Sequence, residues 1–416
     1  MSQYKLQPAE KETLRNLARE YMTCALSDQQ KRIQRLWADF NNGTMQRPMI
    51  MIDQIPWHEM DVDGSLVCTI LHPYWHTVEQ DLRRKIYQYR HMPADMVLPP
   101  YLCLPPILKD PDFRYMGIPV SETVVQTDAK NDIMSYQFHN QFETMADVEK
   151  IKQTYVAHDT EAEQAVLEEA AAVFSGIAPY YFEGIHLNMG LWDIISMWMS
   201  IEECYYALVD DPELLHAIME RCTQVALRWV QEADAGKLFD TASGICHCSC
   251  TLNKPFEDIP PVGSAKNGWV CAQAQLFSSV APSVTREFEV AYMSRIFAQV
   301  GNVYYGCCER LDDRLETICT MPNLRKVSCR PWSDPDVFAE KLPKHIIMSN
   351  KPNPALVCAA CSEPEEFRKH LRKVIAAAKR NGTRLEMILK DLSSVQYHPQ
   401  RLWEAHKIMA EEVQNW

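Results

Sequence analysis

The sequence predicts an α/β protein whose main part is a closed (β/α)8 barrel, the TIM-barrel fold, preceded by a helical N-terminal extension. Short apolar runs alternate with helical patterns along the chain, and eight such runs can be counted. Repeated strand-then-helix units give parallel strands joined by crossover helices. Eight such units over a chain of 416 residues are typical of a closed barrel.

The N-terminal region predicts helices before any strand. Apolar positions such as Leu14, Tyr21 and Trp37 recur at helical spacing within 7–42. We therefore divide the chain into an extension, 1–45, and a barrel, 46–416. The barrel is long, but α/β barrels reach this length as one domain, and the 47% of hydrophobic residues can fill a large core.

The remaining elements follow in order. The expected strands are 47–53, 95–102, 178–182, 269–272, 302–305, 325–328, 345–348 and 384–389. Helices are expected over 160–174 and 212–235. A last helix should begin with a capping box from Ser362 to Glu365 and end at Asn381-Gly382. Ser333 to Asp336 predicts another acidic helix start.

Composition excludes several classes of protein. The net charge of −13 argues against nucleic acid and anionic membranes as partners. No apolar stretch of 18 residues and no signal-peptide core appear, so we expect a cytoplasmic protein. In such a chain the 15 cysteines indicate reduced thiols or metal ligands rather than disulfides.

Reactive residues follow the last four expected strands. They are Gly306-Cys307-Cys308-Glu309, Cys329-Arg330-Pro331-Trp332, Ser349-Asn350-Lys351-Pro352 and Lys390-Asp391. Parallel strands of a barrel end on one face, where the loops share a site. This placement indicates an enzyme.

Two segments carry candidate metal ligands. Cys307 and Glu309 offer a thiolate and a carboxylate at a strand end, and both types bind zinc. The alternative is inert buried cysteine, and on an extended chain only one of the adjacent cysteines should face the barrel axis. The loop Cys246-His247-Cys248-Ser249-Cys250 is rich in soft ligands but lacks a zinc-finger spacing. Asp391 could bind metal, act as a base or cap a turn.

Other polar residues are candidates for substrate contact. Trp57, His58 and Glu59 could form an acid–base pair beside a stacking platform, or a structural tryptophan with surface neighbours. Two expected loops, 104–145 and 236–268, are unusually long, and loops of this length in a compact domain often have a function. The remaining candidates are Asp193, Gln273, Gln275, Lys351 and, in the first loop, Asp128, Asp132 and His139. Asp193 could equally be a first-turn dipole partner, and Lys351 a solvated loop lysine.

Several of these motifs resemble the uroporphyrinogen decarboxylase superfamily, and within it the corrinoid-dependent methyltransferases. That branch includes methylcobamide:coenzyme M methyltransferases and the first methyltransferases of anaerobic O-demethylase systems. The resemblance runs from about residue 45 onward. Its motifs are Arg47-Pro48, Pro56 to Glu59, Tyr305 to Glu309, Arg325 to Trp332, Ser349 to Pro354, Leu389 to Ser393 and Pro399 to Trp403.

The chain departs from the family pattern at two places. The decarboxylases carry R-Q-A-G-R at the first strand, where this chain has Ile52-Asp53-Gln54-Ile55-Pro56, so tetrapyrrole decarboxylation is not expected. The coenzyme M enzymes bind zinc through His-x-Cys and a late cysteine. Here those positions are Tyr305, Cys307 and the neighbourhood of Asp391. The resemblance implies either zinc on Cys307 with Glu309 and Asp391, or no zinc.

The resemblance implies transfer of a methyl group from a small methylated, in particular methoxylated, substrate to the cobamide of a partner corrinoid protein. From this resemblance we expect Tyr305, His58 or Glu59 to carry out proton transfer. The resemblance gives substrate contact to Trp57, Asp193, Gln273, Gln275, Trp332 and Lys351. One alternative is a lyase for a small carboxylated substrate, with Lys351 and Arg330 binding carboxylates. Another is a non-catalytic cobamide- or metal-binding protein. A homodimer would be the commonest assembly.

Overall fold

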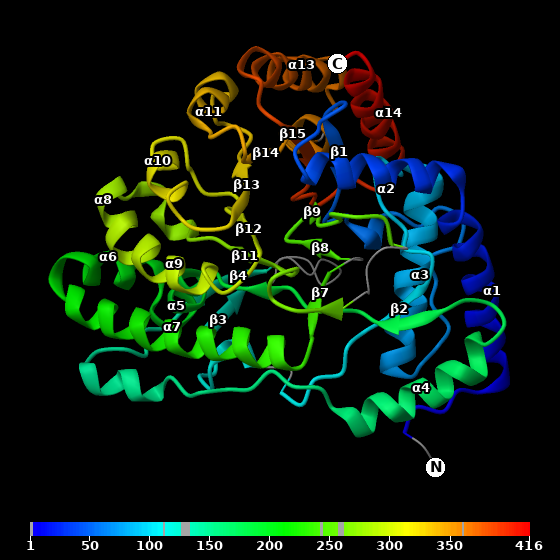
Figure 1. Cartoon of the computed structure of the whole chain (residues 1–416), viewed down its shortest axis with the longest axis horizontal. Coiled ribbons are helices and arrows are strands. Elements are labelled where there is room, and N and C mark those ends of the chain that lie inside the picture. Colours follow the sequence, from blue (N-terminus) through cyan, green and yellow to red (C-terminus); the bar gives the residue numbers. More distant parts are fainter. Residues whose placement is uncertain (1–2, 111–112, 126–133, 242–243, 257–261, 360–361) are drawn as a thin grey trace.

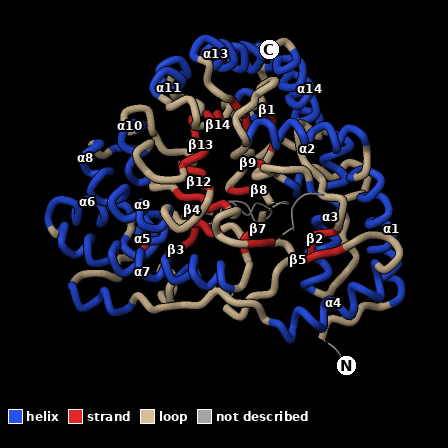
Figure 2. The backbone as a smooth tube through the Cα atoms, in the orientation of Figure 1, coloured by secondary structure: helices blue, strands red, loops and turns tan. Residues whose placement is uncertain are grey.

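The computed structural model describes residues 3–110, 113–125, 134–241, 244–256, 262–359 and 362–416. Helices surround a central group of strands (Figures 1 and 2). The helices are α1 Pro8–Ala25, α2 Asp28–Asn41, α3 Pro73–His91, α4 Thr160–Phe174, α5 Leu191–Met199, α6 Ile201–Asp210, α7 Pro212–Ala235, α8 Pro282–Thr285, α9 Ala291–Phe297, α10 Leu315–Ile318, α11 Pro335–Lys341, α12 Ala355–Cys358, α13 Pro364–Asn381 and α14 Gln400–Gln414.

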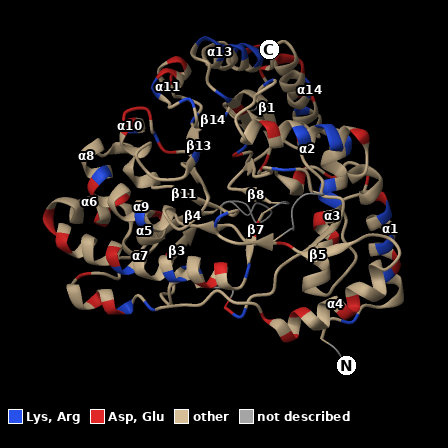
Figure 3. Ribbon diagram, in the orientation of Figure 1, with Lys and Arg blue, Asp and Glu red and all other residues tan. Residues whose placement is uncertain are grey.

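Seven parallel strands form the main sheet, in the order β1-β15-β14-β13-β12-β11-β6. Their bounds are β1 Met49–Ile52, β6 Leu187–Asn188, β11 Trp269–Ala272, β12 Asn302–Tyr305, β13 Leu324–Cys329, β14 Ile347–Asn350 and β15 Leu385–Leu389. Almost every residue of these strands is buried, as expected when helices cover a parallel sheet. Charged side chains lie mainly on the outer helices (Figure 3). The strand order matches the sequence prediction from β11 to β15.

The closed eight-stranded barrel is not found among the described residues. The second and third expected strands shorten to β2 Leu102–Leu104 and β5 Tyr180–Phe182, which pair only with each other. β6, which the sequence did not predict, lies beside β11 and leaves β1 and β6 as the sheet edges. The segment 95–98 forms no strand because side chains bind its backbone and hold it in place. Gln30 donates to Met96 O and accepts from Leu98 N, and Trp37 donates to Asp95 O.

A short hairpin lies inside the curve of the main sheet. It consists of β8 Ile245–Cys246 and β9 Ser249–Cys250, and it is near β11 in Figure 1. Its three cysteines are buried in one cluster with inward side chains of the sheet, including Met51, Tyr304 and Ile388. His247 takes a left-handed conformation at the turn, with φ of 60°. The remaining short strands are β3 Glu122–Val125, β4 Ser135–Phe138, β7 Phe239–Asp240 and β10 Val262–Gly263.

A buried ion pair fixes this hairpin to the sheet. Lys326 Nζ lies 2.8 Å from Glu386 Oε2, and both side chains are fully buried. The same ammonium donates to Ser249 Oγ at 2.6 Å and to Cys250 O at 3.1 Å, while Ser249 Oγ donates to Glu386. Charges so deep in a protein require this density of partners.

Helix α2 covers the N-terminal ends of the strands. Trp37 and Phe40 are buried in the same cluster as the hairpin. Arg384 donates to Phe40 O and Arg325 donates to Asn41 O, at the starts of β15 and β13. The predicted extension therefore packs directly on the sheet.

The ends of the helices test the predicted caps. α13 begins at Pro364 with Glu363 as its N-cap, and Ser362 makes no capping contact, so the predicted capping box is wrong: the proline fixes the helix start one residue later. Gly382 ends α13 in the left-handed conformation, as predicted. In the described part of the chain, no helix combines the length and apolar character needed to cross a membrane.

Candidate active site at the strand ends

The loops after β12 and β15 bring two cysteines beside a lysine and a carboxylate. Cys307 Sγ lies 3.4 Å from Cys308 Sγ and 3.4 Å from Lys390 Nζ. Cys308 Sγ lies 3.3 Å from Asp391 Oδ2. We call Cys307, Cys308, Lys390 and Asp391, together with His247 and Cys248 of the hairpin, the thiol cluster.

Gly306 explains why both cysteine sulfurs reach the same site. Its φ of 95° is left-handed, and a Cβ there would lie 2.7 Å from Leu311 Cδ1, so only glycine suits this turn. The turn interrupts the extended backbone after β12. The expectation that only one cysteine would face the site is therefore wrong.

His247 enters the thiol cluster from the tip of the hairpin. Its Nδ1 lies 3.0 Å from Cys248 Sγ, and its ring stacks on Tyr304 with centroids 5.1 Å apart. Burial disfavours the imidazolium, but hydrogen bonds to the sulfurs of Cys248 and Cys307 outweigh it and raise the pKa of His247 to about 10. The histidine therefore carries a proton at neutral pH.

Cys307 is the acidic member of the cluster. The hydrogen bond from Cys308 lowers its pKa most, burial opposes this, and His247 and Lys390 lower it further, to about 3. Cys308 has its pKa raised, first by the same sulfur–sulfur contact. The cluster thus contains a thiolate, a neighbouring thiol and two cations. Cys308 has one S–H proton, so it can donate a hydrogen bond to Cys307 or to Asp391, but not to both at once.

A group of amides and carboxylates lies on one flank of Cys307. Glu309 accepts from Cys307 N at 2.7 Å, and burial raises the pKa of this carboxyl to about 7. Asp193 accepts from Gln273 Nε2 at 3.0 Å and from Gln275 N and Nε2 at 3.1 Å. The structure therefore brings three predicted substrate contacts together, but they bind one another.

A cavity of about 480 Å³ lies beside the C-terminal end of β1. Trp57 and His58 line it, as do Leu392 and Ser393 from the loop after β15. Glu59 Oε1 lies 3.6 Å from His58 Nε2, and its carboxylate also accepts from Ser394 Oγ and from the N–H groups of Val395 and Tyr397. Its observed contacts orient the 394–397 turn.

Tyr305, Lys351 and Trp332 lie outside both the thiol cluster and the groups beside it. Tyr305 is fully buried on the other face of β12, where its hydroxyl donates to Glu289. Lys351 is buried and gives its hydrogen bonds to Tyr304 Oη at 2.7 Å and to Ser349. Trp332 is 71% exposed.

Another predicted residue, His139, lies away from the thiol cluster. His139 lies on the exposed β3–β4 hairpin, where it contacts Thr123. Asp128 and Asp132 lie outside the described residues.

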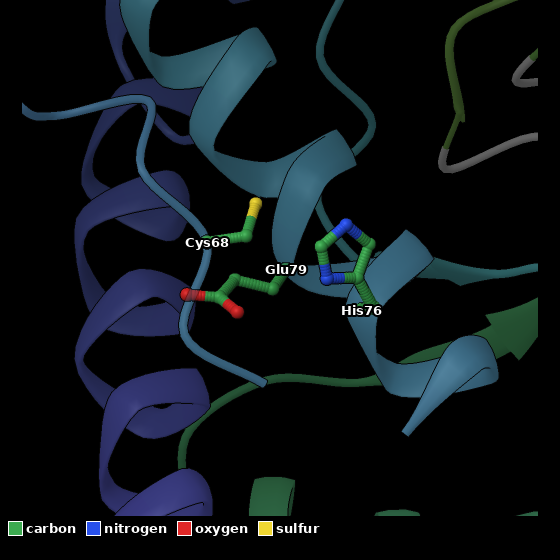
Figure 4. A group of neighbouring side chains, drawn as sticks. All are labelled: Cys68, His76 and Glu79. Carbon is green, nitrogen blue, oxygen red and sulfur yellow. The ribbon is translucent and has the colours of Figure 1, made fainter. Parts of the chain in front are cut away.

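The predicted zinc ligands do not converge on one point. In the described ranges, one group of His, Cys, Asp or Glu ligand atoms lies within 4.8 Å of one another, and it consists of Cys68, His76 and Glu79 (Figure 4). Glu79 accepts from Thr69 N and Ile70 N there. Its carboxylate also pairs with an arginine at 2.8 Å. These contacts already use the carboxylate lone pairs, so the group is structural.

Sequence reasoning did not place Tyr304, His247 and Cys248 at this site. Tyr304 rather than Tyr305 faces it, because alternate strand residues point to opposite faces. His247 and Cys248 belong to the loop singled out for its soft ligands, but nothing in the sequence places that loop inside the sheet. The density of cysteine and histidine was the available signal.

Comparison with known proteins shows the fold. A methyltransferase from Methanosarcina mazei superposes with a TM-score of 0.53 over 91% of this chain and 97% of that chain, at 13% sequence identity. A B12-independent methionine synthase from a Shewanella species, in complex with selenomethionine, covers 72% of this chain and 76% of its own, at 10% identity and a TM-score of 0.34, too low to compare folds. No protein-family model and no curated protein matches the sequence. The first comparison establishes a shared fold.

Proposed function

We propose that this protein is an enzyme that transfers a methyl group from a small methylated compound, in particular a methoxylated one, to the cobalt of a corrinoid on a partner protein. The observation that carries the proposal is the grouping of Cys307 with Cys308, His247 and Lys390 at the strand ends, which lowers the pKa of the Cys307 thiol. The fold shared with a methyltransferase and the motif resemblance support it.

Methyl transfer from oxygen needs help at the leaving atom. The reduced corrinoid supplies the nucleophile that accepts the methyl group. The oxygen left behind is a poor leaving group unless it gains a proton or a Lewis acid. His247 has its pKa raised to about 10 and can provide that proton, and Lys390 places a positive charge beside it. His58, which lines the adjoining cavity, is the second candidate.

The donor types of the thiol cluster fit zinc. Thiolate sulfur, imidazole nitrogen and carboxylate oxygen are its usual ligands in proteins. Cys307 and Cys308 would hold the ion with His247 or Asp391, and these ligand atoms would have to move closer, because no three of them lie within 4.8 Å of one another in this structure. Glu309 is less suited because backbone N–H groups already bind it. Zinc would supply a Lewis acid at the leaving atom.

The two alternatives find less support in the geometry. A lyase would need Lys351 free for a substrate carboxylate, but its ammonium is buried and bonded to Tyr304 and Ser349. A metal-binding role for the cysteine loop alone does not account for its contact with the ionised Cys307. Both alternatives predict no methyl transfer.

Methylation of free cobalamin tests the proposal. The protein is incubated with chemically reduced cob(I)alamin and a panel of methoxylated aromatic and aliphatic compounds, and methylcobalamin is followed by its absorbance. We expect methylcobalamin with at least one donor, and a rate lowered about 100-fold or more in Cys307→Ser. Cys24→Ser, which removes a cysteine far along the chain on α1, should keep the wild-type rate. Methyl transfer that survives in Cys307→Ser would contradict the proposed site.

Elemental analysis tests the zinc proposal separately. We expect about one zinc per chain, lost in Cys307→Ser and retained in Cys68→Ser. Zinc that disappears in Cys68→Ser and remains in Cys307→Ser would place the metal at the group in Figure 4 instead.

A further inference from the structure

Arg84 is a half-buried cation that forms no salt bridge within the described residues. It lies on α3, and its guanidinium carbon is 5.3 Å from the centre of the Trp57 ring. Its neighbours on the helix are paired: Arg83 with Glu79 and Lys85 with Asp81, each at 2.8 Å. Among the described residues, no carboxylate lies within salt-bridge distance of Arg84.

The cavity that Arg84 lines is suited to an anion. Its lining contains Gln54, Ile55, Pro56, Trp57, His58, Leu66, Gln80, Arg84, Leu392 and Ser393. This lining has no acidic residue, and it has one permanent cation. Desolvation lowers the pKa of Arg84, and the attraction of Cys68 and of Asp81, which forms its salt bridge with Lys85, only partly opposes this.

Arg84 keeps its hydrogen-bond donors available. The guanidinium carries five N–H donors, and none of them is bonded to a described residue. Trp57 is itself fixed, because its ring packs edge-on against Tyr87 with centroids 6.1 Å apart. The cavity therefore offers a positioned fork of donors beside Leu66, Ile55 and Leu392, which can cover an apolar body.

One hydrogen bond joins this cavity to the thiol cluster. Gln54, which lines the cavity, accepts from the backbone N–H of Asp391 at 3.2 Å. Asp391 in turn contacts Cys308. A ligand in the cavity thus lies next to the residues to which we give the chemistry.

We propose that this cavity binds an organic oxyanion, with its charged group on Arg84 and its apolar part against Leu66, Ile55 and Leu392. The proposal deepens the proposed function and rests on it in one respect, that the bound anion is the methyl donor. Arg84 then determines the substrate class. A carboxylate, a sulfonate or a phosphate ester shares the required chemistry.

Binding of small probes to the full chain tests the proposal without any methyl transfer. Benzoate, benzenesulfonate and the neutral isostere benzamide are titrated by calorimetry. We expect benzoate or benzenesulfonate to bind at least about tenfold more tightly than benzamide, a difference of about 1.4 kcal/mol. The preferred anion identifies the charged group. Inorganic phosphate should bind more weakly than either ring-bearing anion.

Variants assign the effect to Arg84. Arg84→Met keeps the aliphatic stem and should remove the preference for the anion, while Arg84→Lys should keep part of it. Arg90→Met, an exposed arginine on the same helix, is the control and should bind like the wild type. Equal affinities for benzoate and benzamide, an unchanged preference in Arg84→Met, or no binding of either anion overturns the proposal. If the protein binds these anions but methylates no cobalamin, the anion site is supported and the proposed function is refuted.

Discussion

At the scale of single residues, two adjacent cysteines have opposite acidities. Cys307 has a pKa of about 3, whereas that of Cys308 is raised. The difference arises because one proton between two sulfurs stabilises one thiolate at the expense of the other, and because His247 and Lys390 are beside Cys307. The sequence shows the two thiols, but the three-dimensional arrangement selects the ionised one.

The pKa of Cys307 predicts how its alkylation depends on pH. Since a thiolate is the reactive form and the pKa is about 3, the rate with iodoacetamide should be nearly constant between about pH 5 and 8. Cys24, whose pKa is raised by burial, should react about tenfold faster for each pH unit in the same protein. Mass spectrometry of the alkylated peptides measures both rates.

A histidine variant checks the cause of this acidity. His247→Gln removes the imidazolium and should move the onset of Cys307 alkylation to higher pH. A flat profile in that variant would mean that Cys308 and Lys390 suffice.

Glu309 predicts a pH dependence of stability. Burial raises its pKa to about 7 from an ordinary value of 4.5. The folded protein therefore keeps a proton that the unfolded chain has lost, so this group lowers stability as pH rises from about 5 to 8. The interval corresponds to a loss on the order of 3 kcal/mol. Glu309→Gln should flatten that decline in urea unfolding, and the exposed Glu404→Gln should not.

At the scale of elements, the sequence predicted the regular parts of the fold well. β11 and β12 occupy 269–272 and 302–305, and helices α4 and α7 occupy 160–174 and 212–235, with the predicted bounds. These segments have strong local patterns: buried apolar runs between turns, or helical spacing with acidic starts.

The hairpin that completes the site could not be predicted in the same way. β8 and β9 have two residues each, too few to carry a period. Their position depends on contacts with Lys326 and Glu386, which lie 76 or more residues away along the chain. The sequence identified Cys307 and Asp391 as candidates because each follows an expected strand. It could not place His247 beside them, because the position of His247 depends on the long-range contacts of the hairpin.

Breaking the buried ion pair should release the hairpin. Lys326→Met leaves the carboxylate of Glu386 buried without its cation, at a cost of about 3–5 kcal/mol. The double variant Lys326→Met/Glu386→Leu should regain part of that stability, because it leaves no unpaired charge. Denaturant midpoints measure both, with the exposed Lys369→Met as control. A double variant less stable than Lys326→Met would contradict this account.

At the scale of the whole molecule, β1 and β6 are the two edges of the main sheet in the described part of the chain. The hairpin and α2 fill and cover the space that a closed barrel would enclose. Trp37 of α2 donates Nε1–H to Asp95 O at 2.7 Å, and its ring lies 5.0 Å from Lys326 Nζ. The N-terminal helices, the sheet and the hairpin therefore depend on one another.

This dependence predicts that the N-terminal extension cannot be removed. A chain of residues 46–416 would lose Trp37 and Phe40, which are 0% and 1% exposed, and would uncover the N-terminal ends of the strands. We expect no cooperative thermal transition by near-ultraviolet circular dichroism, and rapid proteolysis. Trp37→Ala in the full chain should cost about 3–5 kcal/mol but retain cooperative unfolding. A shortened chain that unfolds cooperatively at the full-length midpoint would instead establish 46–416 as an independent barrel domain, because the strand ends would then need no cover from α2.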